Sequence, residues 1–285
     1  MRLRVENRSF GRAVRWALFA AFLAYSGLAH SQEVRLRLAT TTSTENTGLL
    51  KVLLPPFEQK NNCKVDVISV GTGKALKLGE RGDADIVLVH ARKAEDKFIA
   101  DGFGVDRRDV MHNDFVILGP ESDPAGIKGE KNPAAVFKKI AEKGSPFISR
   151  GDESGTHVKE KEMWEAAGVA QKGPWYMESG QDMGATLVMA NEKQAYTLCD
   201  RATYLAFRSK IQLKVMSEGD PRLFNPYGVI AVSPQKNPNV KYDLAKAFVE
   251  YITSEEGQKI IGDFKKNGEL LFFPDAIKTP GAPNK

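Results

Sequence analysis

Short apolar strands and amphipathic helices alternate along the chain from residue 34 onward. The segment 83–91, "DADIVLVHA", is almost continuously apolar, which is typical of a strand buried on both faces of a parallel sheet. Repeated alternation of strand and helix indicates an α/β protein. We expect strands over residues 34–41, 64–71, 83–91, 114–120, 146–150, 195–200 and 227–234. We expect helices over residues 48–60, 74–81, 133–144, 156–168, 184–194 and 202–210, the first interrupted near Pro55 and Pro56, and a long helix from Tyr242 to about Lys266.

Two Gly/Pro-rich segments divide these elements into two bodies. They are "GPESDPAGIKGEKNP" at 119–133 and "SEGDPRLFNPYG" at 217–228, where the chain can pass from one body to the other. We expect lobe one to hold residues 32–115 and 226–285, and lobe two to hold residues 116–225. Each lobe is expected to be a mostly parallel sheet flanked by helices. Asn113 and Asp114 stand at one crossing, where they could fix a hinge.

Residues 1–31 have the layout of a secretory signal. Five arginines, the last at Arg15, precede an apolar run from Trp16 to Ala29. This charged-then-apolar order is that of an export signal, and the run is shorter than the roughly 20 residues that a membrane span requires. No cysteine stands directly after the run to carry a lipid anchor. We therefore expect cleavage before Gln32 and a soluble protein in the periplasm.

The export signal also accounts for much of the positive charge. The whole chain has a formal net charge of +5, and removing residues 1–31 leaves 36 basic against 35 acidic residues. A broad basic face for nucleic acid is therefore not expected. Two cysteines, Cys63 and Cys199, make no disulfide framework, and the sequence does not decide whether they form a single bridge. We expect two free, mostly buried thiols. No pattern of metal-binding residues is present in the sequence.

Three segments share one local design, in which a strand ends, a loop rich in Ser, Thr and Gly follows, and a helix starts. The segments are "TTTS" at 40–43, "GTG" at 71–73, and "SRGD" at 149–152 continuing to "SGT" at 154–156. A helix N-terminus presents unpaired N–H groups and a partial positive charge, so such loops can surround a small anion. In open α/β sheets, ligands bind outside the carboxyl ends of the strands, where these loops fall. The sequence predicts an oxyanion cradle formed by the three loops.

Helix capping is the competing explanation for each loop, because Ser, Thr and Asp are preferred N-cap residues in any protein. Four consecutive hydroxyl side chains at 40–43 exceed what one cap can use, which favours binding. Hydroxyls and backbone amides can surround a dianion without adding charge. Arg150 could then supply one planar, bidentate contact, although it could equally form an ordinary surface ion pair.

Enzyme motifs fit poorly. Ser154 stands fourth in "GDESG", whereas a nucleophile elbow places the serine third. His157 follows Ser154 by three residues, but the members of a catalytic triad normally come from separate elements, so a periplasmic hydrolase using this pair is a remote alternative. "GTGKAL" at 71–76 lacks the complete spacing of a nucleotide-binding loop. His90 ends a predicted strand and is expected to be a hydrogen-bonded structural histidine rather than a ligand.

Taken together, the motifs resemble those of the extracytoplasmic solute-binding proteins of ABC importers, and more narrowly the tungstate-binding branch. The resemblance covers nearly the whole chain after residue 32 and rests on the following segments: "TTTSTENTGLL", "GTGKALKLGERGDADIVLVHA", "NDFVILGP", "SRGDESGTH", "WYMESGQDMGATL", "AYTLCDRATYLA", "NPYGVIAV" and "AFVEYITSEEGQKII". It implies a type II-like periplasmic-binding-protein fold with two hinged lobes, a protein that is not an enzyme, and no cofactor.

The resemblance also implies a ligand, a site and a partner. The protein is expected to close on one tungstate ion, or alternatively molybdate, and to deliver it as a monomer to an ABC permease in the inner membrane. Sulfate and phosphate are less favoured ligands. The residues that correspond to the family's anion contacts are Thr41, Thr42, Ser43, Thr72 and Gly73 from lobe one, and Arg150, Ser154, Gly155 and Thr156 from lobe two. The anion is the ligand, and no metal cation is expected at these residues.

The sequence departs from the family pattern at two positions. Asp182 stands where the family usually has glycine, and Ala202 also replaces a common glycine. A carboxylate beside a dianion would oppose binding, so we expect Asp182 either to point away from the anion or to lie outside the site. A sensory or adhesive module that binds a ligand but serves no transporter would need the same closure and remains a rival to transport.

Overall fold

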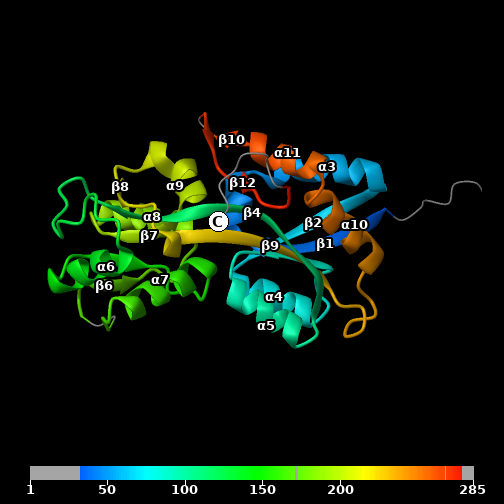
Figure 1. Cartoon of the computed structure of the whole chain (residues 1–285), viewed down its shortest axis with the longest axis horizontal. Helices are drawn as coiled ribbons and strands as arrows, with labels where there is room; N and C mark the ends of the chain where they lie inside the picture. Colours follow the sequence, from blue (N-terminus) through cyan, green and yellow to red (C-terminus); the bar gives the residue numbers. More distant parts are fainter. Residues whose placement is uncertain (1–32, 171–172, 267, 278–285) are drawn as a thin grey trace, which may run out of the picture. The chain divides into compact units, whose positions relative to one another are not determined.

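The computed structural model describes residues 33–170, 173–266 and 268–277 (Figure 1). The predicted export signal and its cleavage site lie outside the described residues. The helices are α2 (Thr42–Thr47), α3 (Leu50–Asn61), α4 (Thr72–Glu80), α5 (Arg92–Ala100), α6 (Pro133–Glu142), α7 (Gly155–Ala166), α8 (Met183–Glu192), α9 (Arg201–Phe207), α10 (Tyr242–Ile252) and α11 (Glu255–Asp263). The strands are β1 (Val34–Thr41), β2 (Cys63–Val70), β3 (Ile86–Val89), β4 (Gly104–Gly119), β5 (Phe147–Ser149), β6 (Tyr176–Glu178), β7 (Thr197–Asp200), β8 (Lys214–Ser217), β9 (Phe224–Val232), β10 (Lys265–Lys266), β11 (Glu269–Leu270) and β12 (Phe273–Pro274).

The main sheet is mixed, which corrects the expectation of mostly parallel sheets. Its central order is β12-β4-β9-β3-β1-β2. β1 pairs with β3 in parallel, but β9 is antiparallel to both β3 and β4. The α/β class is confirmed. The expectation of mostly parallel sheets is wrong because β9, which returns to the main sheet after the segment that forms β5 to β8, runs antiparallel between β3 and β4.

Alternate residues of the central strands face two different helix layers. In β3, Ile86 and Leu88 join the apolar cluster that includes α3, α10 and α11, whereas Val87 and Val89 join that of α4 and α5. Figure 1 shows α4 and α5 on one side of these strands and α3, α10 and α11 on the other. Because successive side chains of a strand point to opposite faces, both sets are buried. This burial on both faces explains the apolar run at 83–91.

A single long strand, β4, serves both halves of the structure. Its first part pairs with β9 up to Asp114, and its last part, from Phe115, pairs with β7 and β8. At this change of partner, Arg201 forms a bidentate ion pair with Asp114, with both nitrogen–oxygen distances at 2.6 Å. The position expected to form a hinge is therefore the place where β4 passes from one set of partners to the other.

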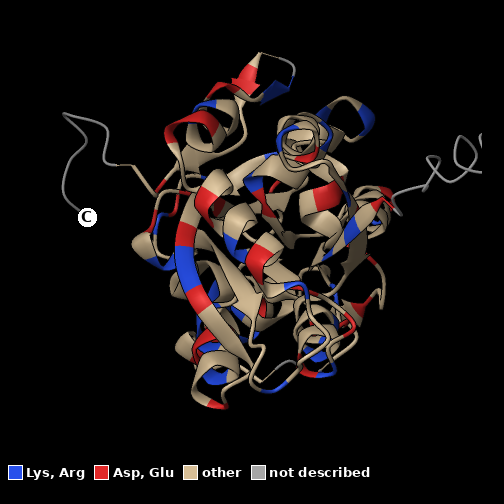
Figure 2. Cartoon of the chain, turned by 90° about the vertical axis from the view of Figure 1, so that its right-hand side faces the viewer, with Lys and Arg blue, Asp and Glu red and all other residues tan. Residues whose placement is uncertain are grey.

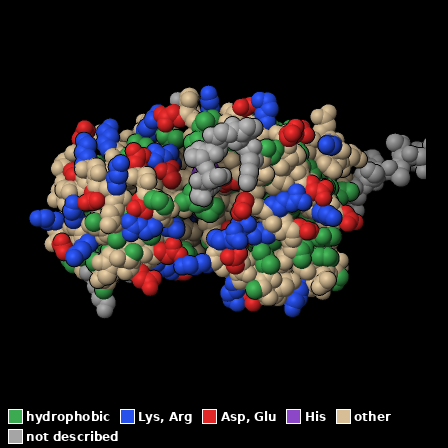
Figure 3. Space-filling model, viewed as in Figure 1, with side chains coloured by type: hydrophobic (Ala, Val, Ile, Leu, Met, Phe, Trp, Pro, Cys, Tyr) green, Lys and Arg blue, Asp and Glu red, His purple; other side chains and the backbone are tan. Residues whose placement is uncertain are grey.

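Basic and acidic residues alternate along the ribbon in Figure 2, and their side chains are intermixed over the face shown in Figure 3. Many form pairs, such as Arg92 with Asp96 at 2.7 Å and Lys93 with Glu162 at 2.9 Å. Exposed pairs of this kind contribute little to stability, because water screens both charges.

The expected helices over 48–60 and from Tyr242 onward differ in detail from the structure. α3 continues through Pro55 and Pro56, and the two carbonyls that thereby lose an N–H partner belong to residues with exposed side chains, where water can replace it. The long C-terminal helix is divided into α10 and α11. Ser254 caps α11 by accepting a hydrogen bond from Gly257 N at 3.3 Å, and this cap starts a new helix.

Both cysteines are buried thiols, as expected. Burial in apolar surroundings and the nearby carboxylate of Asp200 raise the pKa of Cys199 well above its ordinary value. Cys199 is therefore held in its neutral form.

An aromatic cluster with one buried carboxyl group forms the core beside α6 and α7. Trp164 packs edge-on against Phe137 and Phe147, with ring centroids 4.4 and 5.1 Å apart. Glu160 accepts hydrogen bonds from Trp164 Nε1 at 3.1 Å and from Tyr176 OH at 2.9 Å. Burial outweighs these bonds and raises the pKa of Glu160 to about 7.

Glu160 should make the stability of the protein pH-dependent. The carboxyl group of Glu160 binds its proton more tightly in the folded protein than in the unfolded chain. Its contribution to the free energy of unfolding is therefore full below about pH 4.5 and is lost as the pH rises through about 7. The loss amounts to about 3 kcal/mol. Urea unfolding at pH 5 and pH 8 should show that Glu160→Gln removes this part of the pH dependence. The exposed control Glu165→Gln on the same helix should retain it, and equal pH dependence in wild type and Glu160→Gln would contradict the assignment.

Candidate functional site

The three predicted loops lie where α2, α4 and α7 begin. Thr41 and Ser154 act as N-caps: Thr44 N donates to Thr41 Oγ1, and His157 N donates to Ser154 Oγ, both at 3.3 Å. Gly71 precedes α4 and provides no side-chain cap. For Thr41 and Ser154, therefore, the capping explanation holds, and any contact of these hydroxyls with a ligand would be additional to their role as caps.

The loop at 71–73 and the start of α7 are in close contact. A Cβ atom placed on Gly155 would lie 3.0 Å from His90 Cε1 and 3.3 Å from Thr72 Oγ1. A Cβ on Gly73 would lie 4.0 Å from the carbonyl oxygen of Glu153. Segments that are more than 80 residues apart in the sequence thus meet at glycines, and Gly155 leaves no room for a side chain without a shift of His90.

Two threonine hydroxyls and one arginine nitrogen at this junction are buried without a hydrogen-bond partner. They are Thr72 Oγ1, Thr156 Oγ1 and Arg150 Nε. Thr72 is 2 % exposed and Thr156 is 1 % exposed. Leaving a buried donor unpaired costs about 1–3 kcal/mol. Three such groups at one junction indicate a place for an acceptor.

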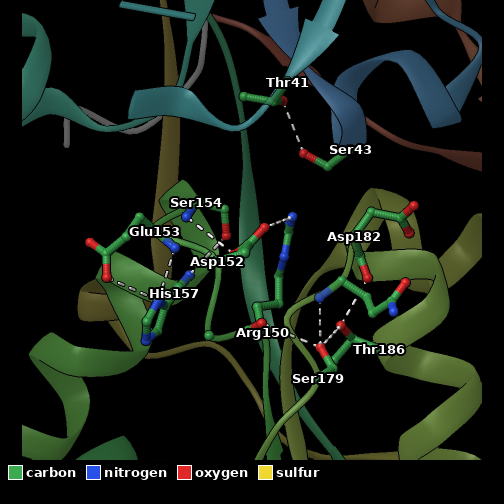
Figure 4. A network of polar contacts seen from close by, with 12 residues as sticks. Thr41, Ser43, Arg150, Asp152, Glu153, Ser154, His157, Ser179, Asp182 and Thr186 are labelled. Atoms are coloured by element: carbon green, nitrogen blue, oxygen red, sulfur yellow. Dashed lines mark hydrogen bonds and ion pairs between the residues drawn. The ribbon is translucent and has the colours of Figure 1, made fainter. Parts of the chain in front are cut away.

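Arg150 is a buried cation with one close partner. It is 4 % exposed, and its Nη2 forms an ion pair with Asp152. Figure 4 shows the Arg150 guanidinium pointing toward Thr41 and Ser43. Asp152 also accepts a hydrogen bond from Ser154 N at 3.2 Å, so its carboxylate holds the loop as well as the guanidinium. The ion pair is therefore buried and structural rather than the surface pair considered from the sequence.

The hydroxyls at 40–43 do not act alike. Thr40 donates to the carbonyl oxygen of Leu88 at 2.8 Å and so belongs to the sheet. Thr41 Oγ1 lies 3.0 Å from Ser43 Oγ, and Ser43 Oγ lies 3.5 Å from His90 Nε2. Thr42 is half-buried. Thr41 and Ser43 thus form one polar group facing Arg150, and Thr40 does not take part.

His90 and the start of α9 complete the polar surroundings, and sequence reasoning gave neither a binding role. His90 is buried at the end of β3, and its Nδ1 lies 2.9 Å from Asn225 Oδ1, so the expected structural hydrogen bond is present. Asp200 caps α9 through Oδ1, which accepts from Thr203 N at 2.8 Å. Its Oδ2 and the hydroxyl of Thr203 are buried without a partner. The repeated pattern of a strand followed by a polar helix start in "TLCDRAT" could have revealed this fourth loop.

Asp182 is a helix cap. Its Oδ1 accepts a hydrogen bond from Ala185 N at 3.0 Å, and its side chain is exposed. The carboxylate is therefore directed to the N-terminus of α8, where a negative charge is favourable. The first of the two expectations for Asp182, that it points away from the cradle, agrees with this geometry.

The hydrolase alternative lacks the required hydrogen bond. Ser154 Oγ accepts from the backbone of His157, while His157 Nδ1 accepts from Glu153 N at 3.1 Å (Figure 4). A nucleophile and its base need a direct side-chain contact. Both side chains are instead used to shape the first turn of α7.

A cleft of about 710 Å³ adjoins the cradle. Its lining includes the buried residues Thr72, His90 and Gly155, the exposed Gly73, and side chains with charges of both signs: Arg92, Lys93, Lys159, Arg222, Glu153 and Glu162. The cleft thus connects the polar junction with residues nearer the surface.

Within the described ranges, no group of three or more His, Cys, Asp or Glu side chains could hold a metal ion. No described helix is both long and apolar enough to cross a bilayer.

Comparison with known proteins identifies the family. The PBP superfamily domain matches residues 28–256. The tungstate-binding protein TupA of Peptoclostridium acidaminophilum is 47% identical over 245 residues, which cover 85% of this chain and 86% of that protein. The tungstate ABC transporter structure from Geobacter sulfurreducens is 62% identical, covers 81% of this chain and 98% of its own, and has a TM-score of 0.75. The tungstate-binding protein TupA from Desulfovibrio alaskensis G20 is 48% identical, covers 86% of this chain and 100% of its own, and also has a TM-score of 0.75.

These matches confirm the two-lobed periplasmic-binding-protein fold that the sequence motifs implied. The chain belongs to the PBP superfamily and, within it, to the family of the tungstate-binding proteins TupA.

Proposed function

We propose that the protein captures one tungstate ion at the junction of the three loops and delivers it to an ABC importer. The observation that carries the proposal is the set of buried groups without partners: Thr72 Oγ1, Thr156 Oγ1 and Arg150 Nε. One tetrahedral oxyanion has several acceptor oxygens and could satisfy all three. The relatives named for tungstate binding support tungstate as that anion.

The chemistry of these groups suits a dianion. Hydroxyls and backbone N–H groups at helix starts donate hydrogen bonds without adding charge, and Arg150 adds one cation whose charge Asp152 partly balances. Burying a dianion is costly unless its oxygens are hydrogen-bonded. We therefore expect the bound anion to contact Thr41, Thr42, Ser43, Thr72 and Gly73 from one side, and Arg150, Ser154, Gly155 and Thr156 from the other.

Closure of two lobes would form the site. We place residues 32–115 and 226–285 in lobe one and residues 116–225 in lobe two, with the hinge where β4 changes partners at Asp114 and Phe115. The close approach of Gly155 to His90 and Thr72 brings the two proposed lobes into contact. An anion that binds between them would shift the population toward this closed arrangement.

We infer that the protein acts as a monomer in the periplasm after removal of residues 1–31, is not an enzyme, and passes tungstate to a permease in the inner membrane. Molybdate has the same charge and shape as tungstate, so it remains the alternative ligand.

Isothermal titration of the purified protein with tungstate, molybdate, sulfate and phosphate tests the ligand. Tight one-to-one binding of tungstate with little heat from sulfate or phosphate is expected. Binding of sulfate or phosphate in preference to tungstate would keep the fold and overturn the ligand.

Arg150→Met should weaken tungstate binding about 100-fold, because it removes a charge-assisted donor worth up to about 3 kcal/mol. Titration calorimetry would measure the loss. Asp182→Asn is the matched control, since it also changes one charge but leaves an N-cap residue at an exposed position. The control should bind within about twofold of wild type, and equal losses in both variants would contradict the placement of the anion beside Arg150.

Thr72→Val and Thr156→Val should each weaken tungstate binding about tenfold through the loss of one hydrogen bond. Neither should lower the melting temperature of the ligand-free protein, because each removes a buried hydroxyl that has no partner. Thr197→Val is the matched control: its hydroxyl donates to the carbonyl oxygen of Ile148 at 2.8 Å, so the variant should lose stability and keep its affinity. If Thr72→Val and Thr156→Val instead lowered the melting temperature and kept the affinity for tungstate, the unpaired hydroxyls would not face the ligand.

Gly155→Ala should weaken binding without removing any donor, because the added Cβ would lie 3.0 Å from His90 Cε1 in the closed arrangement. Alanine is favoured over glycine in a helix, so the ligand-free protein should be at least as stable as wild type. Small-angle scattering with saturating tungstate should show a more open form than wild type gives. Unchanged affinity and compaction would mean that the lobes do not close at this contact.

A further inference from the structure

His90 occupies the point where three helix starts meet. Its Nε2 lies 3.5 Å from Ser43 Oγ at the start of α2. Its ring lies beside Gly155 at the start of α7, and the same glycine is close to Thr72 at the start of α4. His90 also lines the cleft. The imidazole is thus placed among residues that we expect to contact the anion.

A chain of hydrogen bonds fixes which nitrogen of His90 carries the hydrogen. Asn225 Nδ2 donates to Asn113 Oδ1 at 2.6 Å, which turns Asn225 Oδ1 toward His90. His90 Nδ1 lies 2.9 Å from this oxygen and must donate to it. In the neutral imidazole the other nitrogen, Nε2, then carries a lone pair. The Nε2 lone pair is therefore an acceptor on the side of the ring that faces Ser43.

Charged groups of opposite sign surround the imidazole. Asp200 at the end of β7 favours the protonated form, while Arg150, which follows β5, opposes it. Burial has the largest effect, and it lowers the pKa of His90 below 6.5. Tyr227 of β9 stacks on the ring with centroids 4.6 Å apart, and burial raises its pKa so that it stays neutral. The cleft beside His90 is also lined by Arg92, Lys93, Lys159, Glu153 and Glu162, which carry charges of both signs. The start of α2 brings the Ser43 hydroxyl near the ring, and the first turns of α2 and α4 also carry Glu45 and Lys74.

A dianion entering the site would reverse this balance. An unprotonated Nε2 would repel an anion oxygen through its lone pair, whereas a protonated Nε2 would donate a hydrogen bond to it. A negative charge within about 4–6 Å favours a protonated imidazole.

We propose that His90 takes up one proton from solvent when a dianion enters the cradle and donates Nε2–H to it. The proposal rests on the proposed function, because it requires an anion at this junction. The proton passes from the buffer to Nε2, so the anion is then held by two cationic side chains, Arg150 and His90. An anion that already carries a proton, such as hydrogen phosphate, could instead donate to the neutral Nε2 and would require no uptake.

Titration calorimetry with sodium tungstate in buffers of equal pH and different ionisation enthalpy measures proton uptake directly. Wild type at pH 7.5 should take up a measurable fraction of a proton, and at most one, per tungstate. Its dissociation constant should rise by up to about tenfold per pH unit over the range in which His90 is neutral in the free protein and charged in the complex. His90→Gln should bind more weakly, take up no proton, and lose this pH dependence.

Glu160→Gln is the matched control, because Glu160, with a pKa of about 7, is the rival site for a proton. Its uptake should equal that of wild type. The imidazole resonances of His90 in wild type give a second readout that does not depend on the folding of His90→Gln, and they should change from neutral to charged when tungstate is added.

Three results separate the possibilities. Absence of tungstate binding in wild type would overturn the proposed function itself. Tungstate binding without proton uptake, or with His90 resonances that stay neutral, would overturn the role of His90 and leave the function intact. Uptake that disappears in Glu160→Gln would assign the proton to Glu160 and also overturn the proposal.

Discussion

The burial of Arg150 at a junction of incompletely paired donors is the constraint on which the site depends. A guanidinium with little exposure to water needs partners, and among the described residues Asp152 provides a close anionic partner, through Nη2. Arg150 Nε and the hydroxyls of Thr72 and Thr156 remain unpaired. At about 1–3 kcal/mol for each group, this arrangement opposes the closed form in the absence of a ligand. An oxyanion at the junction would remove that penalty, so closure and binding are coupled through the same few groups.

The surrounding fold supplies the rigidity that such a junction needs. β4 and β9 run side by side from the main sheet to the place where β4 takes β7 and β8 as partners. The paired residues Asn113 and Asn225 lie on these strands, and Asn225 connects them to His90. A displacement of either strand would therefore move His90 relative to Ser43. This continuous set of hydrogen bonds links the proposed hinge to the proposed ligand contacts.

The sequence predicted the class of fold and the three loops, because strand and helix periodicity and polar helix starts are local properties. It did not identify which hydroxyls are available. Thr40 is bonded to the sheet and Thr41 caps α2, whereas the single hydroxyl of Thr72 is unpaired. The prediction of mostly parallel sheets was wrong, because β4 and β9 pair antiparallel although about a hundred residues separate them in the sequence. Local periodicity carries no information about the direction of such a distant partner. His90 could not be placed because its contacts, Ser43 and Asn225, are 47 and 135 positions away in sequence. The role of Asp182, by contrast, could have been predicted from the preference for Asp at N-caps.

A crystal structure of the protein grown with tungstate tests the central claim most directly, because the anomalous scattering of tungsten locates the anion without prior assumptions. The account predicts one tungstate at the junction of the three loops, with Thr72 Oγ1, Thr156 Oγ1 and Arg150 Nε each within about 3 Å of one of its oxygens. Tungstate bound elsewhere, or bound at the junction while these three groups remain unpaired, would contradict it.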